Sequence, residues 1–108
     1  MAKKLHQLKP EVSKIVREYY RHLLDAEIPI KALIVFGSQA RGTANASSDI
    51  DIAVVSPIFG KDYFDEMVML RHLRKGLYEI EPHPMHPNDL NAKWSTFTNE
   101  VKKYGIPV

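Results

Sequence analysis

Two short segments rich in apolar residues, 32–36 and 49–55, constrain the fold of this chain more than any other feature of its sequence. Residues 32–36 (Ala-Leu-Ile-Val-Phe) contain no polar side chain, which is typical of a strand buried on both faces. Residues 49–55 alternate acidic and apolar residues before becoming apolar throughout, which also predicts a strand. Because 108 residues are the size of one domain, we expect a single domain over residues 1–108, with a basic leader at 1–9.

Helical periodicity precedes the first strand. Between Pro10 and Pro29, apolar residues recur at the i, i+3, i+4, i+7 spacing of one buried helical face. The residues expected on that face are Val12, Ile15, Val16, Tyr19, Leu23 and Leu24. A second helix is predicted over residues 62–75, with acids at its start, bases at its end and Gly76 as its C-terminal cap.

The second helix and the segments after it complete the predicted elements. The inward face of residues 62–75 is expected to comprise Phe64, Met67, Val68, Leu70 and Leu73. A third strand is predicted at residues 77–81, ending at Pro82, and the prolines predict irregular structure at 83–87. A last helical region carries Trp94, Phe97, Val101 and Tyr104 on one face and ends at Gly105.

The order of these elements, α-β-turn-β-α-β-α, predicts the fold class. Strands that alternate with helices favour a mixed α/β (α+β) domain. We expect a small mixed β-sheet with helices packed mainly on one face.

The chemistry-bearing pattern lies between the first two strands: Gly37-Ser38, ten residues, then Asp49-Ile50-Asp51. Residues two apart in a strand face the same way, so Asp49 and Asp51 present adjacent carboxylates, which a divalent cation would stabilise. Oxygen ligands without cysteine favour Mg²⁺ or Mn²⁺ over zinc. A glycine after a buried strand lets a phosphate approach the backbone, and Ser38 adds donors. Arg41 lies nearby and is suited to bidentate phosphate binding.

This pattern indicates phosphoryl or nucleotidyl transfer. Four fixed residue types at this spacing arise by chance in about one chain of this length per thousand. The alternative is a plain Gly-Ser turn followed by an aspartate that caps a strand. No Gly-x₄-Gly-Lys sequence is present, which excludes a P-loop nucleotide-binding site.

Residues 36–42 and 48–54 closely resemble the DNA polymerase β-like nucleotidyltransferase superfamily. Within it, the chain is most similar to the minimal nucleotidyltransferases, one-domain proteins often paired with a HEPN-domain partner in toxin–antitoxin modules. The resemblance extends from about residue 30 to residue 84, and the flanking helices match only in kind.

The resemblance implies a role for each matching residue. Gly37 and Ser38 would hold the triphosphate of a nucleotide, and Asp49 and Asp51 would bind catalytic Mg²⁺, with two ions expected and Mn²⁺ as the alternative. The superfamily uses a third carboxylate on a neighbouring strand. Glu81 is the residue we assign to it, as both a catalytic and a metal-binding group. Glu79 has the same strand parity and is the alternative.

The implied activity is transfer of AMP from ATP to a hydroxyl acceptor, through in-line attack on the α-phosphorus. By resemblance, the acceptor is a tyrosine of a HEPN toxin, which makes this chain the antitoxin. Since 108 residues leave little room for an acceptor, we expect another protein to complete that site. The alternative function is a non-catalytic module that binds nucleotide or neutralises a partner. Nucleotidylation of an aminoglycoside is a third interpretation, disfavoured because such enzymes need an added domain.

Composition excludes several other classes. Fifteen basic and thirteen acidic residues give a net charge of only +2, and the lysine pairs near the ends have no interleaved aromatics, so direct nucleic-acid binding is not expected. The absence of cysteine excludes disulfides and is consistent with a cytoplasmic location. No apolar run approaches the ~20 residues of a membrane span. The oligomeric state is left open.

Overall fold

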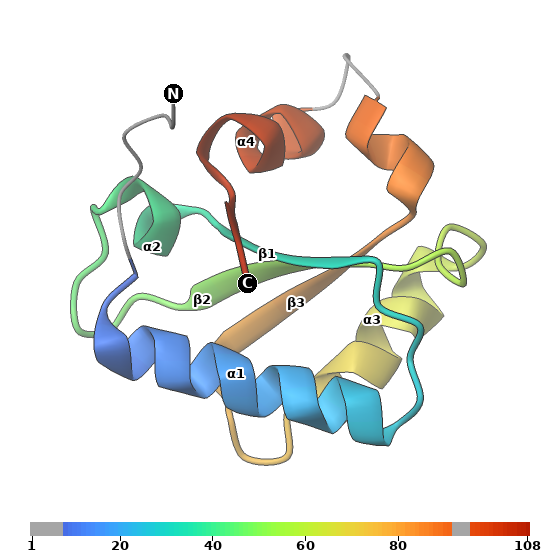
Figure 1. Cartoon of the computed structure of the whole chain (residues 1–108), viewed down its shortest axis with the longest axis horizontal. Coiled ribbons are helices and arrows are strands. Elements are labelled where there is room, and N and C mark those ends of the chain that lie inside the picture. The colour runs from blue at the N-terminus through green and yellow to red at the C-terminus, as the bar shows by residue number, and fades with distance from the viewer. Residues whose placement is uncertain (1–7, 92–95) are drawn as a thin grey trace.

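The computed structural model describes residues 8–91 and 96–108, which form a sheet with helices on both faces (Figure 1). The strands of the described residues are β1 (Ala32–Phe36), β2 (Ile50–Val55), β3 (Ile80–Met85) and β4 (Ile106–Pro107). The helices are α1 (Pro10–Asp25), α2 (Ser38–Arg41), α3 (Tyr63–His72) and α4 (Thr96–Tyr104), with a 3-10 helix, η1 (Pro87–Asn91). The sheet order is β3-β2-β1-β4; β1 is antiparallel to β2 and β4, and β2 is parallel to β3. The predicted mixed α/β fold is confirmed.

The larger part of the core lies between the sheet and helices α1 and α3, which cover the same face (Figure 1). Val16, Tyr19 and Leu23 of α1 are fully buried, as predicted. The strand residues that they meet are Leu33, Val35, Ile50, Ile52, Val54 and Ile80. Leu24, which was expected on the buried face, is 55% exposed instead. The helix repeat places it 100° around the axis from Leu23, toward solvent.

Tyr19 links α1 to α3. Its side chain is fully buried, and its hydroxyl donates a hydrogen bond to the backbone carbonyl of Leu70 at 2.8 Å. Burial raises the pKa of Tyr19, and the nearby charge of Arg74 offsets this only in part. The hydroxyl therefore remains protonated and keeps donating at neutral pH.

A smaller core lies on the opposite face of the sheet, under α4 and η1 (Figure 1). Its buried members are Phe36, Ala53, Val55, Met85 and Val101. Val101 is buried as predicted, whereas Trp94 lies outside the described residues. Most helical packing is thus on the α1 face, and α4 covers the other. None of the helices in the described ranges is long and apolar enough to cross a membrane.

Strand β3 differs from the prediction, which ended the third strand at Pro82 and made residues 83–87 irregular. The strand instead runs on to Met85 with both Pro82 and Pro84 inside it. It is the edge strand of the sheet, and the carbonyls of Glu79 and Met85 accept bonds from the β2 side. The alternate residues, the two prolines among them, point their nitrogens to the open edge. No donor is required there, so proline is tolerated.

Helix α3 also differs in its ends and in its inward face. Its C-cap is Leu73, and Gly76 lies in the turn beyond, so the predicted cap at Gly76 is wrong. Leu70 is fully buried, but Phe64 and Val68 are 67% and 39% exposed. Phe64 and Val68 are one turn apart on the face opposite Leu70, so burying Leu70 turns them toward solvent.

The turn before α3 is closed by the side chain of Glu66. Its carboxylate accepts hydrogen bonds from the backbone N–H groups of Gly60 at 3.0 Å, Lys61 at 3.0 Å and Asp62 at 3.2 Å. Burial alone would raise the pKa of Glu66, but these bonds to its charged form outweigh burial and lower it.

We expect Glu66→Gln to lower the free energy of unfolding by about 1 kcal/mol at pH 7. Because the folded pKa lies below the unfolded value of about 4.3, this stabilisation is complete above that value and lost as the pH falls through the folded pKa. Urea unfolding of both proteins at pH 7 and near pH 2.5 measures it, with the exposed Glu18→Gln as control. An equal loss of unfolding free energy at both pH values would show that the charged Glu66 carboxylate does not provide this stabilisation.

Candidate active site

Strand β1 ends at Phe36, and Gly37 follows it in a backbone conformation that is close to exclusive to glycine. Its φ of 74° and ψ of −153° lie in a region that other residues enter only with strain. A Cβ at this position would overlap Oδ2 of Asp51, and it would lie 3.3 Å from that residue's Cγ. The glycine is therefore required twice, by the turn and by the carboxylate packed against it.

Ser38 begins α2, a four-residue helix between the first two strands, where no helix is predicted from the sequence. The helix ends at Gly42, whose left-handed conformation lets its N–H and that of Thr43 bond the Ser38 carbonyl, at 2.9 and 3.0 Å. The first N–H groups of a helix have no partner within it, so they are suited to bind an anion. Ser38 thus directly follows the glycine that packs against the Asp51 carboxylate.

The three predicted acids lie at neighbouring positions in or beside strands β2 and β3. Asp49 is exposed and directly precedes β2, and Asp51 is the second residue of that strand. Asp51 pairs in register with Glu81 of β3, so both side chains lie on the α4 face of the sheet. Glu79, the alternative third acid, lies in the turn before β3 and lines a cavity of about 170 Å³ beside the start of α1. The register therefore brings Glu81 rather than Glu79 beside Asp51.

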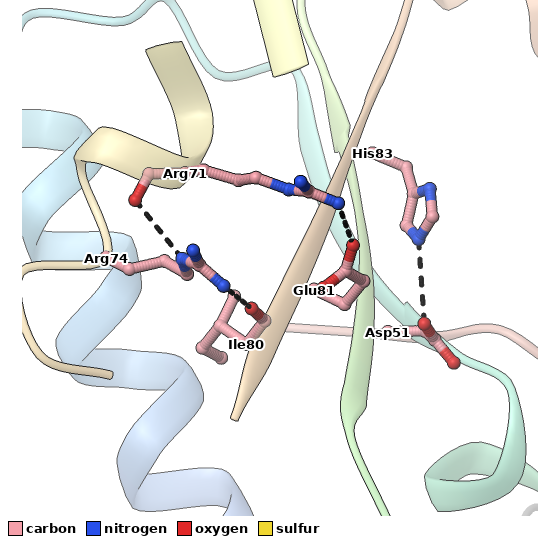
Figure 2. Close-up of polar contacts among 6 residues, drawn as sticks. All are labelled: Asp51, Arg71, Arg74, Ile80, Glu81 and His83. Atoms are coloured by element: carbon pink, nitrogen blue, oxygen red, sulfur yellow. Dashed lines mark hydrogen bonds and ion pairs between the residues drawn. The ribbon is translucent and has the colours of Figure 1, made fainter. Parts of the chain in front are cut away.

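Two of these carboxylates have side-chain nitrogens as neighbours, one from a histidine and one from an arginine (Figure 2). Oδ1 of Asp51 is 3.5 Å from Nε2 of His83, whose ring packs against Phe36 with ring centres 5.3 Å apart. Oε2 of Glu81 is 2.5 Å from Nη2 of Arg71, which extends from α3 across β3. Asp51 and Glu81 are therefore directed to different partners although their strand positions are adjacent.

The acids fit a hard divalent cation by chemistry, since Mg²⁺ and Mn²⁺ prefer carboxylate oxygens. Asp49 and Asp51 offer these oxygens from one end of β2, and the packing of Asp51 against Gly37 leaves no side chain between it and the start of α2. Within residues 8–91 and 96–108, however, no three His, Asp or Glu side chains are close enough to surround one ion. Glu81, the third acid, is held by Arg71 in this conformation.

Arg41, the predicted phosphate ligand, lies at the end of α2 with its guanidinium on α4. It forms an ion pair with Glu100 and lies 5.9 Å from the centre of the Tyr104 ring. The side chain therefore connects α2 with α4 here, and phosphate binding by Arg41 stays a prediction.

Two residues near the acids were not assigned to the site by the sequence. His83 falls in the segment 83–87 that the prolines predict to be irregular, but it lies within β3 and faces Asp51. Strand parity relates His83 to Glu81 and gives the only sequence signal for it. Arg71 was read as a helix-end cation, and no local pattern predicts that it reaches Glu81.

The chain belongs to the nucleotidyltransferase domain family, whose sequence profile matches residues 5–104. No curated protein has a significant sequence match to it. The resemblance drawn from residues 36–42 and 48–54 is therefore confirmed at the level of the family.

Solved structures share the fold. A putative nucleotidyltransferase from Sulfolobus solfataricus is 21% identical with a TM-score of 0.69, covering 90% of this chain and 78% of that one. A toxin–antitoxin structure with AMP-PNP is 22% identical with a TM-score of 0.58, covering 84% of this chain and 69% of that one. A mutant of the toxin–antitoxin MntA–HpeT is 18% identical with a TM-score of 0.57 and the same coverage.

Proposed function

We propose that this protein transfers AMP from ATP to a hydroxyl acceptor in a Mg²⁺-dependent reaction that breaks the α–β phosphoanhydride bond and releases pyrophosphate, and that the acceptor is a tyrosine of a HEPN toxin. The observation that carries the proposal is the turn at Gly37-Ser38, packed directly against the Asp51 carboxylate. That contact brings a glycine turn, where a phosphate can approach the backbone, next to a carboxylate that can hold a cation, as nucleotidyl transfer requires.

Each residue has a stated task in this proposal. Gly37 and Ser38 bind the triphosphate through backbone N–H groups and the hydroxyl. Asp49 and Asp51 hold Mg²⁺, with Glu81 as the third carboxylate; bound Mg²⁺ supplies charge neutralisation and activation of the acceptor oxygen. Arg41, if released from Glu100, adds positive charge beside the phosphates.

The assignment of ATP and of a toxin partner is supported by the structural neighbours. One of the similar toxin–antitoxin structures contains AMP-PNP, an ATP analogue. In the MntA–HpeT mutant, two aspartates two positions apart are replaced by glutamates, the spacing of Asp49 and Asp51 here. An antitoxin role in the cytoplasm, where ATP and Mg²⁺ are abundant, is part of the proposal.

The experiment is intact mass spectrometry of the partner. The product of the neighbouring gene, as the proposed HEPN partner, is incubated with this chain, ATP and Mg²⁺. We expect a mass increase of whole adenylyl groups, located on tyrosine by peptide mapping and absent with EDTA. An unmodified partner in a stable complex would support the alternative, a non-catalytic module, which the separation of Glu81 from the other acids favours.

A further inference from the structure

Arg71 reaches from α3 past the edge strand to Glu81 on the α4 side of the sheet (Figure 2). Its Nη2 donates to Oε2 of Glu81 at 2.5 Å, the shortest polar contact that Glu81 makes among the described residues. The Cα positions of Asp51 and Glu81 are paired in register, yet the Glu81 carboxylate is directed to the helix. The backbone therefore puts Glu81 beside the other acids, and Arg71 draws its side chain away.

We propose that Arg71 is a positioning residue that holds Glu81 away from the Asp49–Asp51 pair, and that Glu81 joins these acids only when its ion pair with Arg71 opens. The inference rests on the proposed function, since it assumes that Asp49 and Asp51 bind a divalent cation. It accounts for the absence of any three-residue metal site in the described part of the chain.

The ion pair between Arg71 and Glu81 is weak enough to open. The side chains of Arg71 and Glu81 are 42% and 28% exposed, and a pair this accessible to water shifts an equilibrium by about fivefold at most. A bound cation and its extra positive charge compete directly with the guanidinium for the carboxylate.

Opening the pair does not require α3 to move, because Arg74 attaches the end of the helix to the edge strand independently. Nη1 of Arg74 donates to the Ile80 carbonyl at 3.2 Å, and its Nε donates to the Arg71 carbonyl at 3.2 Å (Figure 2). Both acceptors are backbone oxygens, so neither bond depends on the side chain of Arg71 or Glu81. Arg71 can therefore release Glu81 by rotation of its own side chain.

The test is a Mn²⁺ titration of the full chain without nucleotide, with free Mn²⁺ measured by electron paramagnetic resonance. Arg71→Gln is expected to bind Mn²⁺ about fivefold more tightly than wild type, because Glu81 becomes available. Arg71→Lys, which keeps the cation, is expected to match wild type. Glu81→Asp removes one methylene from the reach toward Arg71 and is expected to tighten binding without any change in α3.

A double-mutant cycle separates this mechanism from simple removal of a positive charge. In the Glu81→Gln background, Arg71→Gln is expected to change Mn²⁺ affinity less than twofold. An equal gain with and without Glu81 would overturn the proposal, as would unchanged affinity in both Arg71→Gln and Glu81→Asp. If Asp51→Asn also leaves Mn²⁺ binding unchanged, the metal site itself fails, and with it the proposed function. Circular dichroism checks that each variant is folded.

Discussion

Asp51→Asn is expected to reduce nucleotidyl transfer by at least about a thousandfold while leaving the fold intact. The substitution preserves size but replaces a carboxylate, the preferred Mg²⁺ ligand, with a neutral amide. Asp51 is the acid that packs against Gly37 and lies in register with Glu81, so no other side chain at the described sheet positions replaces it. The measurement is the initial rate of AMP incorporation into the partner at saturating ATP.

The matched control for this variant is Asp65→Asn. Asp65 is an exposed aspartate in the first turn of α3, on the side of the sheet away from Asp51, and its substitution is expected to leave the rate unchanged. Thermal unfolding shows whether each variant is folded. If the Asp51→Asn protein is folded and transfers AMP at the wild-type rate, Asp51 is not part of the active site.

Gly37→Ala is expected to lower the free energy of unfolding by about 3 kcal/mol and to reduce transfer by at least about a hundredfold. Alanine must adopt a φ of 74° with a ψ of −153°, which is strained for any side chain. Its Cβ would also overlap the Asp51 carboxylate, so either the turn or that side chain must shift. Urea unfolding and the transfer rate measure the two effects separately.

Gly76→Ala separates strain from overlap. Gly76 also has a positive φ, 98°, but a Cβ there meets nothing within 4 Å. Its substitution is expected to cost about 1–2 kcal/mol of stability and leave transfer unchanged. If both alanine variants lose the same stability and neither loses activity, the contact between Gly37 and Asp51 does not contribute to nucleotidyl transfer.

The two central strands could be predicted from the sequence because their signals are local. Residues 32–36 are apolar throughout, and residues 50–55 carry the same signal after an acidic start, so burial alone defines them. The spacing from Gly37 to Asp51 was equally informative. Strands β1 and β2 pair antiparallel across the connection of residues 37–49, and their register places Phe36, the last residue of β1, opposite Asp51.

The extent of the edge strand and the inward face of α3 could not be predicted, because both depend on where these elements lie in the fold. Proline signals irregular structure in an isolated segment, and only the edge position of β3 makes Pro82 and Pro84 acceptable. The apolar residues of α3 do not lie on one face, so the sequence did not decide between Leu70 and the pair Phe64 and Val68. The packing of α3 against β3 determines that Leu70 is buried and that Phe64 and Val68 are exposed.

The candidate site likewise has features that the sequence predicts and contacts that it does not. Strand parity allowed both Glu81, the residue assigned from the sequence, and Glu79, the alternative, and the pairing of β2 with β3 places Glu81 opposite Asp51. The contacts of Arg71 with Glu81 and of Arg41 with Glu100 join residues of different elements. No periodicity or motif encodes such contacts, so both depended on the three-dimensional structure.

The most direct test of the central claim compares ATP labelled in the α-phosphate with ATP labelled in the γ-phosphate. The chain, the proposed HEPN partner and Mg²⁺ are incubated with each label, and the label on protein is counted. Nucleotidyl transfer predicts label on the partner from α-labelled ATP only, with loss of the signal in Asp51→Asn. Label from the γ-phosphate, or α-label that persists in Asp51→Asn, would contradict the account.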